Sequence, residues 1–448
     1  MRKKMLTMLF ALFVCCTYAQ TTITVMDSVI YHDGYAKLVA DAAPRPGVVK
    51  LRNDLFTRKL SAAELLSIGT KLQMNVFVSA LCDNYDRIGN VHMALVPAGS
   101  AAYKPDTVKR IELGRFITPF MNKNVKPTTV PYTFNIDNVA MLLKDTAITD
   151  NFDIWLELSL FGVPYAANTQ VAGCNGRNDV FMGKLELVTN SPAPLQSSNI
   201  LLPLFFNNNF NNYQANATDS IGVTQRTLRF VVPENLTDAA LFLITSNHGA
   251  NTGGEEYNRR FHFVYFDDAL KLSYKPGRTT CEPFRKYNTQ GNGIYGSSVK
   301  SPASWQSFSN WCPGDVIDTR RIDLGPLTKG THTFQIRVPA AVFVNKEGNF
   351  PLSLYLQGKT MGVLTNVVDN IETNDLFTVY PNPSTGQFTV ELSTDNAEIL
   401  VTDLLGKQKI KTKAYSSVVN LELNESGVYI LHVTSKMYTS SKKIVVNR

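Results

Sequence analysis

Apolar residues recur at every second position along most of this chain, and this pattern constrains the fold more than any other feature. Two examples are the series Leu228, Phe230, Val232 and the series Phe334, Ile336, Val338. Side chains two positions apart share one face of a strand, so the pattern predicts strands that are buried on one side. Turns rich in Asn, Gly and Pro separate these short segments. The chain is therefore expected to be mainly β, built from antiparallel jelly rolls or β-sandwiches.

The chain has 448 residues, which is too long for one ordinary core. A polar, proline-containing stretch at 189–199 divides the body, and the aromatic density falls after Gly358. The predicted units are a signal peptide at 1–19, an N-terminal jelly-roll domain at 20–190, a C-terminal jelly-roll domain at 195–360, a linker at 361–373 and a small β-sandwich domain at 374–448. The two jelly rolls are expected side by side. A helix is predicted at 61–71, and the Asn-rich run 207–216 is expected to be a surface loop.

The N-terminus has the pattern of an export signal. Three basic residues at 2–4 precede an apolar run at 5–16, and Ala19 ends a small-residue cleavage site. An alternative is lipid attachment through Cys15 or Cys16, but the residue before each of them is not small. No later segment reaches the ~20 apolar residues of a membrane span, so no transmembrane segment is predicted in the mature protein.

Charge and cysteine content limit the classes of partner and the compartment. Without the three basic residues of the signal, the formal net charge falls from +7 to +4, and no Lys/Arg cluster is present, which argues against nucleic acid as a partner. Four cysteines remain in the mature chain: Cys82, Cys174, Cys281 and Cys312. An even number in an exported protein predicts disulfides, with three possible pairings.

Several short motifs place carboxylates beside possible partners. The segment at 82–87 reads CDNYDR and puts Asp86 next to Arg87; alone, this is most often a solvated turn with an ion pair worth ~0–1 kcal/mol. The later segments are GRFITPF at 114–120, DIWLEL at 153–158 and GGEEYNRRFH at 253–262. Amide hydrolysis requires a carboxylate that activates water, a proton donor for the leaving group and a cleft that excludes solvent.

CDNYDR followed by GRFITPF resembles the segment of the peptide-N-glycosidase F family that carries its principal catalytic aspartate. The motifs SPASW at 301–305, WCPG at 311–314 and RID at 321–323 follow in the family's order. The resemblance covers roughly residues 75–323. It implies an exported amidase that hydrolyses the bond between an asparagine side chain and the first N-acetylglucosamine of an N-glycan. N-glycoproteins or glycopeptides would be its substrates, and no cofactor would be needed.

The resemblance also implies roles for individual residues. Asp86 would be the primary catalytic carboxylate, and Glu256 and Arg87 would hold a water with it. The implied substrate-binding residues are Glu157, Tyr85, Tyr257 and Trp311. For Trp311, a sugar-stacking or cleft-wall position and a buried core position both stay open. The resemblance implies the disulfide Cys281–Cys312, which leaves Cys82 to pair with Cys174, since the family's own partner for Cys82 falls near Phe77.

The sequence departs from the family pattern in two places, and the second departure, a missing arginine, favours a second hypothesis, although the retained Asp86, Arg87, Glu157 and Glu256 argue against it. Gly254 and Asn258 stand where the family has cysteines, and the gap between Trp305 and Trp311 lacks a second active-site arginine. Arg259 or Arg260 is a candidate replacement. The alternative function is a secreted glycan- or protein-binding module on the same fold, without turnover.

A third hypothesis is an oxidative copper enzyme, because the fold of the peptide-N-glycosidase F family is similar to that of copper-dependent peptidylglycine monooxygenases. The six histidines are isolated from one another in the sequence, with no His-x-His pair and no HExxH motif. The sequence therefore predicts no metal site. His248 and His262 remain candidates for lining the cleft near Glu256.

The C-terminal segment carries four further signatures. They are YPNPSTGQFTV at 380–390, VTDLLGK at 401–407, SGVYILHV at 426–433 and KKIVV at 442–446. Together they resemble the C-terminal sorting domain of the type IX secretion system of Bacteroidetes. This implies the type IX machinery as a partner and export through the outer membrane to the cell surface or the medium.

Overall fold

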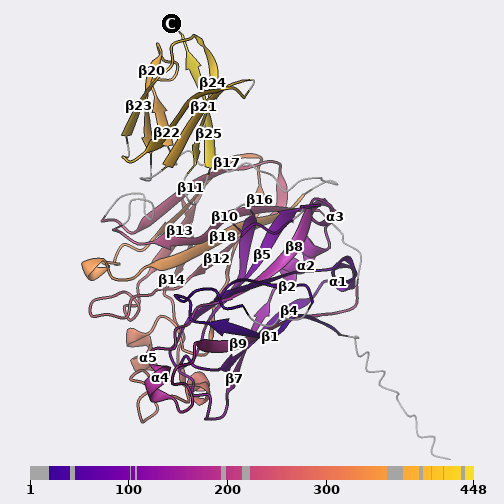
Figure 1. The fold of residues 1–448 in the computed structure, drawn as a ribbon, viewed down its shortest axis with the longest axis vertical. Coiled ribbons are helices and arrows are strands. Elements are labelled where there is room, and N and C mark those ends of the chain that lie inside the picture. Colours follow the sequence, from indigo (N-terminus) through magenta and orange to yellow (C-terminus); the bar gives the residue numbers. More distant parts are fainter. Residues whose placement is uncertain are drawn as a thin grey trace, which may run out of the picture.

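The computed structural model describes residues 20–40, 46–100, 102–105, 108–192, 198–213, 222–360, 377–392, 397–404, 406–416, 418–434 and 439–447 (Figure 1). The predicted signal peptide at 1–19 and linker at 361–373 lie outside these residues. The described part consists mainly of antiparallel sheets, which confirms the fold class expected from the alternation.

Two sheets form the first sandwich. The four-stranded sheet has the order β1 (Thr21–His32), β9 (Asp179–Thr189), β4 (Leu72–Ala80) and β7 (Thr129–Asn135). The six-stranded sheet has the order β15 (Val316–Ile317), β6 (Lys109–Ile117), β5 (Ile88–Pro97), β8 (Phe152–Leu160), β3 (Leu55–Lys59) and β2 (Val48–Arg52). Every second residue of β4 is buried, so this sheet presents one apolar face to the core.

Two further sheets form the second sandwich. One has the order β10 (Asn199–Phe210), β18 (Phe350–Thr360), β12 (Leu236–Thr245) and β16 (Arg320–Leu327). The other has the order β11 (Gln225–Val232), β17 (Gly330–Arg337), β13 (His262–Phe266) and β14 (Ala269–Tyr274). The alternating residues of both predicted series are buried, as the sequence indicates: Leu228, Phe230, Val232, Phe334, Ile336 and Val338.

The C-terminal β domain also has two sheets. Their orders are β19 (Phe377–Tyr380), β20 (Gln387–Leu392), β23 (Val418–Glu422), and β22 (Gln408–Ala414), β21 (Ala397–Asp403), β24 (Gly427–Thr434), β25 (Thr439–Val446). A buried apolar cluster of its own includes Phe388, Val390 and Leu431. This domain therefore has a core separate from those of the two sandwiches.

The helices of the described part are short. They are α1 (Ala62–Ser67), α2 (Asp137–Leu143), α3 (Thr146–Thr149), α4 (Ala167–Gln170), α5 (Pro302–Phe308) and the 3₁₀ turns η2 (Glu282–Tyr287) and η3 (Val344–Lys346). Among the residues described, no helix has the length and apolarity to cross a bilayer.

The helix predicted at 61–71 is present but shorter. Ser61 caps α1 as expected, in a capping box with Glu64, but the helix ends at Ser67 and buries none of its side chains. The chain leaves the helix at Gly69, where an added Cβ would lie 2.1 Å from the Asn190 side chain. This tight passage into β4 explains why the apolar stripe does not continue as a helix.

The Asn-rich run was expected as a surface loop from 207, and that expectation is wrong for its first four residues. Residues 207–210 belong to β10, where Asn208 and Phe210 pair with Leu352 and Phe350 of β18. A register shift between Phe205 and Asn208 accommodates the asparagines in the sheet. Residues 214–216 lie outside the described part.

The two sandwiches are joined along β6. Strand β15 lies between elements of the second sandwich in sequence but pairs with β6, with Val316 opposite Phe116 and Ile317 opposite Arg115. On the same side, β6 contacts β10, β12 and β18. Phe242 and Tyr355 of the second sandwich belong to the main buried cluster of the first. The junction is thus continuous packing rather than a hinge.

Candidate active site

The loop between β4 and β5 carries the CDNYDR motif and is organised by Asp83. This carboxylate is 1% exposed. Its Oδ2 accepts hydrogen bonds from Arg87 Nε at 2.7 Å and from the Val163 amide at 2.8 Å, and its Oδ1 accepts from the Tyr85 amide at 2.9 Å. The Cys82–Cys174 disulfide fixes the start of the same loop. These bonds set the conformation in which the loop presents Asp86.

Asp86 is a carboxyl with an unusual pKa. Burial and the charge of Glu256 raise the pKa of Asp86 from its ordinary value to about 7, against the opposing charge of Arg87. Asp86 precedes β5 of the first sandwich, while Glu256 follows β12 of the second. The structure therefore brings these two predicted residues together across the junction. Because the two carboxyls interact, their titrations are coupled.

Two glycines position Glu256. Gly253 has a φ of +84°, which favours glycine, and a Cβ on Gly254 would lie 2.0 Å from the Gly249 carbonyl oxygen. The resulting turn allows the Gly249 amide to donate to Glu256 Oε2 at 3.1 Å. Burial raises the pKa of Glu256, although this hydrogen bond and one from Tyr257 oppose the shift.

Asn258 and Asn310 hold the turn that follows Glu256. Asn258 Nδ2 donates to the Gly254 carbonyl at 2.6 Å, so a hydrogen bond joins the two positions where the family pattern has cysteines. Asn310 Nδ2 donates to the carbonyls of Glu255 at 3.0 Å and Asn258 at 3.3 Å, and also to that of Glu256. Asn310 lies in the gap that lacks the expected arginine and fixes the backbone of the glutamate turn.

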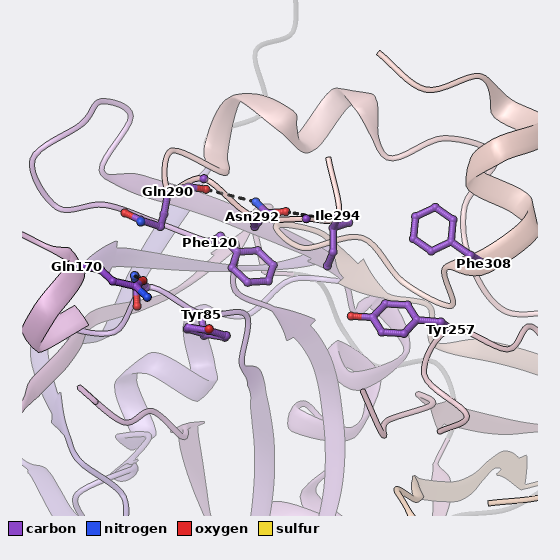
Figure 2. A pocket seen from close by; sticks show the side chains of 11 residues that line it. Tyr85, Phe120, Gln170, Tyr257, Gln290, Asn292, Ile294 and Phe308 are labelled. Carbon is purple, nitrogen blue, oxygen red and sulfur yellow. Dashed lines mark hydrogen bonds between the residues drawn. The ribbon is translucent and has the colours of Figure 1, made fainter. Parts of the chain in front are cut away.

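A pocket of 490 Å³ opens at the junction (Figure 2). It is lined by Asn84, Tyr85, Phe120, Gln170, Tyr257, Gln290, Gly291, Asn292, Gly293, Ile294 and Phe308. Aromatic rings and carboxamides dominate this lining, and no charged side chain contributes to it among the described residues. Such walls suit a neutral ligand with apolar faces and many hydrogen-bonding groups, such as a sugar.

The pocket lies directly beside the acidic pair. Tyr85 precedes Asp86 and Tyr257 follows Glu256, and both tyrosines line the pocket (Figure 2). Burial and the charges of Glu256 and Asp86 raise the pKa of Tyr257, and its hydroxyl hydrogen-bonds Glu256. The side chains of the predicted residues Asp86, Glu256, Tyr85 and Tyr257 thus form one site.

Glu157 does not join this site. The alternation of β8 does place Glu157 opposite the core face, but its side chain is 1% exposed within a separate cluster. Arg110 Nε donates to Glu157 Oε2 at 2.9 Å and Nη2 donates to Oε1 at 3.0 Å, while Tyr103 and His92 also bind the carboxylate. Burial alone would raise the pKa of Glu157, but His92 and Arg110 lower it to about 2. Its oxygens are saturated by protein donors, so none is left for a sugar.

The arginines differ from the expected arrangement. Arg87 Nε and Nη2 donate to Asp83, and no hydrogen bond from Arg87 to Asp86 or Glu256 is present among the described residues. Arg260 pairs with Glu255 at 2.9 Å, and Arg259 Nε donates to the Pro276 carbonyl at 2.6 Å. Neither therefore replaces the missing second arginine in this structure.

Trp311 takes the buried position of its two alternatives. It is 6% exposed, its indole N–H donates to the Asn247 carbonyl at 2.9 Å, and it packs with Ile117, Ile244 and Ile317 at the junction. The second disulfide, Cys281–Cys312, lies next to it in sequence. The structure thus contains both expected cysteine pairs, the one that the resemblance implies and the one that remained.

The histidines do not form a metal site with neighbouring ligands. In the described part of the chain, no group of three or more His, Cys, Asp or Glu residues has the arrangement of a metal centre. Burial lowers the pKa of His248 and of His262 to about 3. His248 Nε2 is 2.7 Å from Ser246 Oγ, and His262 stacks on Tyr274, so neither lines the pocket.

Several residues that shape the site carry no recognisable signal in the sequence. Asp83 lies inside the quoted motif, but two aspartates there precede one arginine, and only the path of the loop decides which of them binds it. Gln290 and Asn292 lie in a polar, glycine-containing segment without a recognisable pattern. The Gln290 amide donates to the Phe120 carbonyl at 2.9 Å, which ties this wall of the pocket to the first sandwich.

The fold and site define a class of protein: paired β-sandwiches with an acidic pair and an uncharged pocket at their junction, followed by a separate β domain. Family comparison agrees. The model described as "Peptide-N-glycosidase F, N terminal" matches residues 22–177, and "Peptide-N-glycosidase F, C terminal" matches residues 212–357. The chain belongs to the peptide-N-glycosidase F family. Residues 378–447 match "Secretion system C-terminal sorting domain", which assigns the protein to type IX secretion, to the cell surface or the medium.

Solved structures with the same fold are distant in sequence. PNGF-II in its P21 crystal form is 21% identical with a TM-score of 0.54, over 76% of this chain and 65% of that one. A peptide-N(4)-(N-acetyl-β-D-glucosaminyl) asparagine amidase is 16% identical with a TM-score of 0.50, over 77% of this chain and 97% of that one. The chain thus spans about two thirds of the length of PNGF-II. No curated protein matches the chain.

Proposed function

We propose that this protein is an exported amidase that hydrolyses the bond between an asparagine side chain and the first N-acetylglucosamine of an N-glycan. The observation that carries the proposal is the electrostatic interaction of Asp86 with Glu256 across the junction, beside the uncharged pocket. The pKa of Asp86 is raised to about 7, within the range in which a carboxylate serves as a base in neutral water.

The reaction requires one base and one acid, and Asp86 serves as each in turn. The oxygen of a water, held between Asp86 and Glu256, forms a bond to the amide carbon, and its proton passes to the Asp86 carboxylate. The carbon–nitrogen bond then breaks, and the nitrogen takes the proton that Asp86 has accepted. The products are a free glycan amine and an aspartate in place of the asparagine. Arg87, held by Asp83, contributes a fixed positive charge next to the forming oxyanion.

The pocket supports a sugar as the bound group. Tyr85, Phe120, Tyr257 and Phe308 offer ring faces, and the carboxamides of the wall offer donors and acceptors without charge. Figure 2 shows the hydroxyl of Tyr257 directed toward the space between Tyr85 and Ile294. A ligand in this space reaches the acidic pair with its end nearest the tyrosines.

A second candidate function is glycan binding without turnover. The specific observation in its favour is the position of the arginines, since Arg259 and Arg260 bind Pro276 and Glu255 instead of facing the acidic pair. In this case, the pocket retains its ligand but the amide is not cleaved.

Incubation of the protein with a denatured N-glycoprotein separates the two functions. The amidase releases free glycan, and the variant Asp86→Asn binds a glycopeptide but releases none. Binding by both proteins with release by neither contradicts the amidase and favours the binding module. Unchanged release by Asp86→Asn contradicts the role of Asp86.

A further inference from the structure

Arg115 of the GRFITPF motif is a fully buried cation that the catalytic proposal does not use. It lies on β6 opposite Asn90 of β5 and Ile317 of β15, and its exposed fraction is 0%. Its Nε donates to Glu112 Oε1 at 2.9 Å and its Nη2 donates to Glu112 Oε2 at 2.7 Å. This bidentate pair neutralises the charge within the first sandwich.

The remaining donors of Arg115 all reach the second sandwich. Nη1 donates to Ser246 Oγ at 2.8 Å and to the Pro351 carbonyl at 2.8 Å, and Nη2 donates to Asn207 Oδ1 at 3.0 Å. Ser246 directly follows β12, Pro351 belongs to β18 and Asn207 to β10. One guanidinium thus fixes three strands of the second sandwich relative to β6.

From Ser246, the contacts continue to the catalytic glutamate. Because Ser246 Oγ accepts from Arg115, its hydrogen is free to donate to His248 Nε2, which lies at 2.7 Å. Burial and the charge of Arg115 lower the pKa of His248 to about 3, so this ring is neutral and accepts the bond. The next residue, Gly249, donates its amide to Glu256 Oε2 at 3.1 Å.

The residues that extend β6 also bind the loop that carries Asp86. Three residues after Arg115, Thr118 Oγ1 accepts the amide hydrogen of Arg87 at 2.7 Å, and the Thr118 amide donates to the Arg87 carbonyl at 2.8 Å. Strand β6 and its extension therefore bind both the loop of Asp86 and, through Ser246 and His248, the turn of Glu256.

We propose that Arg115 is a positioning residue that sets the separation of Asp86 and Glu256 by fixing the second sandwich on the first. This inference rests on the proposed function. Lysine is a poor replacement, since one ammonium group cannot satisfy a bidentate carboxylate and three further acceptors in a planar arrangement. Loss of the Ser246 hydroxyl removes the contact to His248 while the ion pair with Glu112 stays.

The pKa of Asp86 depends on its separation from Glu256, and it can be measured even if the protein releases no glycan. The charged and titratable groups that face Asp86 are Glu256, Arg87, Asp83 and Tyr257. A looser junction moves Glu256 away and admits water, and both changes lower the pKa of Asp86. The pKa is measured by NMR on protein labelled at the aspartate carboxyl carbons, with Asp86→Asn to assign the signal.

The variants are Ser246→Ala and Arg115→Lys, and Arg110→Lys is the matched control. Arg110 is 12% exposed and paired with a carboxylate on the same sheet, but the hydrogen-bond acceptors of its guanidinium in the described residues lie within the first sandwich. We expect a lower Asp86 pKa and a roughly tenfold to hundredfold lower kcat in Ser246→Ala and Arg115→Lys. In Arg110→Lys, a lower melting temperature with an unchanged Asp86 pKa is expected.

An unchanged Asp86 pKa in folded Ser246→Ala and Arg115→Lys overturns the positioning role, as does an equal shift in Arg110→Lys. If the parent protein releases no glycan, the proposed function fails, but the NMR comparison still decides the inference. If the parent is active and the pKa stays constant in all variants, the proposed function stands and the inference fails.

Discussion

Arg87 binds Asp83 rather than its direct neighbour Asp86: Nε lies 2.7 Å from Asp83 Oδ2, and Nη2 lies 3.3 Å from Oδ1. The Asp83 side chain is 1% exposed and that of Arg87 is 22% exposed. Asp83 thus orients the arginine, and within the part of the chain that the structure describes Asp86 forms no direct ion pair with a cation. Burial and Glu256 therefore outweigh the charge of Arg87 in setting the pKa of Asp86.

Replacement of Asp83 tests this division of roles. Asp83→Asn leaves a partly buried guanidinium without its carboxylate, and the free energy of unfolding should fall by about 3–5 kcal/mol. The matched control is Asp179→Asn, which removes a more exposed pair with Arg177 and should cost about 1 kcal/mol or less. Urea unfolding measures both, and equal losses would contradict a special role of Asp83.

Glu157 should act on stability and not on substrate. Its pKa is lowered to about 2, so folding is stabilised above the ordinary value of 4.5, and this stabilisation is lost as the pH falls toward 2. The melting temperature of Glu157→Gln should therefore be well below that of the parent at pH 7 and approach it near pH 2. A glycopeptide KM that rises without a change in melting temperature would show a substrate contact instead.

The raised pKa of Asp86 changes the stability with pH in the opposite direction to that of Glu157. The folded protein binds a proton at Asp86 up to about pH 7, so ionisation of this group reduces stability as the pH rises from 3.8 through 7. Asp86→Asn removes this penalty and should raise the melting temperature at pH 8 more than at pH 4. Glycan release by the parent should increase with pH across the same range, since the base must be ionised. A stability difference independent of pH argues against the raised pKa.

The glycine wall of the pocket offers a test of ligand position. A Cβ on Gly291 meets no atom within 4 Å, and the residue lines the pocket, so a large side chain there occupies ligand space without a backbone clash. Gly291→Leu should raise KM about tenfold with kcat nearly unchanged, and Gly291→Ala should have a small effect. If the two variants and the parent have equal kinetics, the ligand does not contact this wall of the pocket.

Much of the fold follows from the sequence because the physical signal is local. The burial of Phe230 and Phe334 follows from period-two alternation, and the Ser61 cap follows from a capping box. Strand β15 could not be predicted, since two residues carry no period and its partner β6 lies about two hundred positions away. Likewise, alternation put Glu157 on the correct face, but only the packing of Phe206 from β10 against His92 shows that this face is covered.

In the candidate site, too, some features could be predicted from the sequence and others could not. The proximity of Asp86 to Glu256 was expected because both lie in motifs of the family. The partner of Arg87 depends on the loop path between β4 and β5, which no local pattern specifies. Trp311 was compatible with two environments, and the neighbouring isoleucines of both sandwiches decided between them.

Hydrolysis in ¹⁸O-labelled water tests the central claim most directly. The parent protein and Asp86→Asn are incubated with a single purified N-glycopeptide, and the peptide product is analysed by mass spectrometry. The account predicts that the parent alone converts the glycosylated asparagine to aspartate with one ¹⁸O atom in the new carboxyl group. A peptide that keeps its glycan, or a released glycan with an unlabelled asparagine left on the peptide, would contradict it.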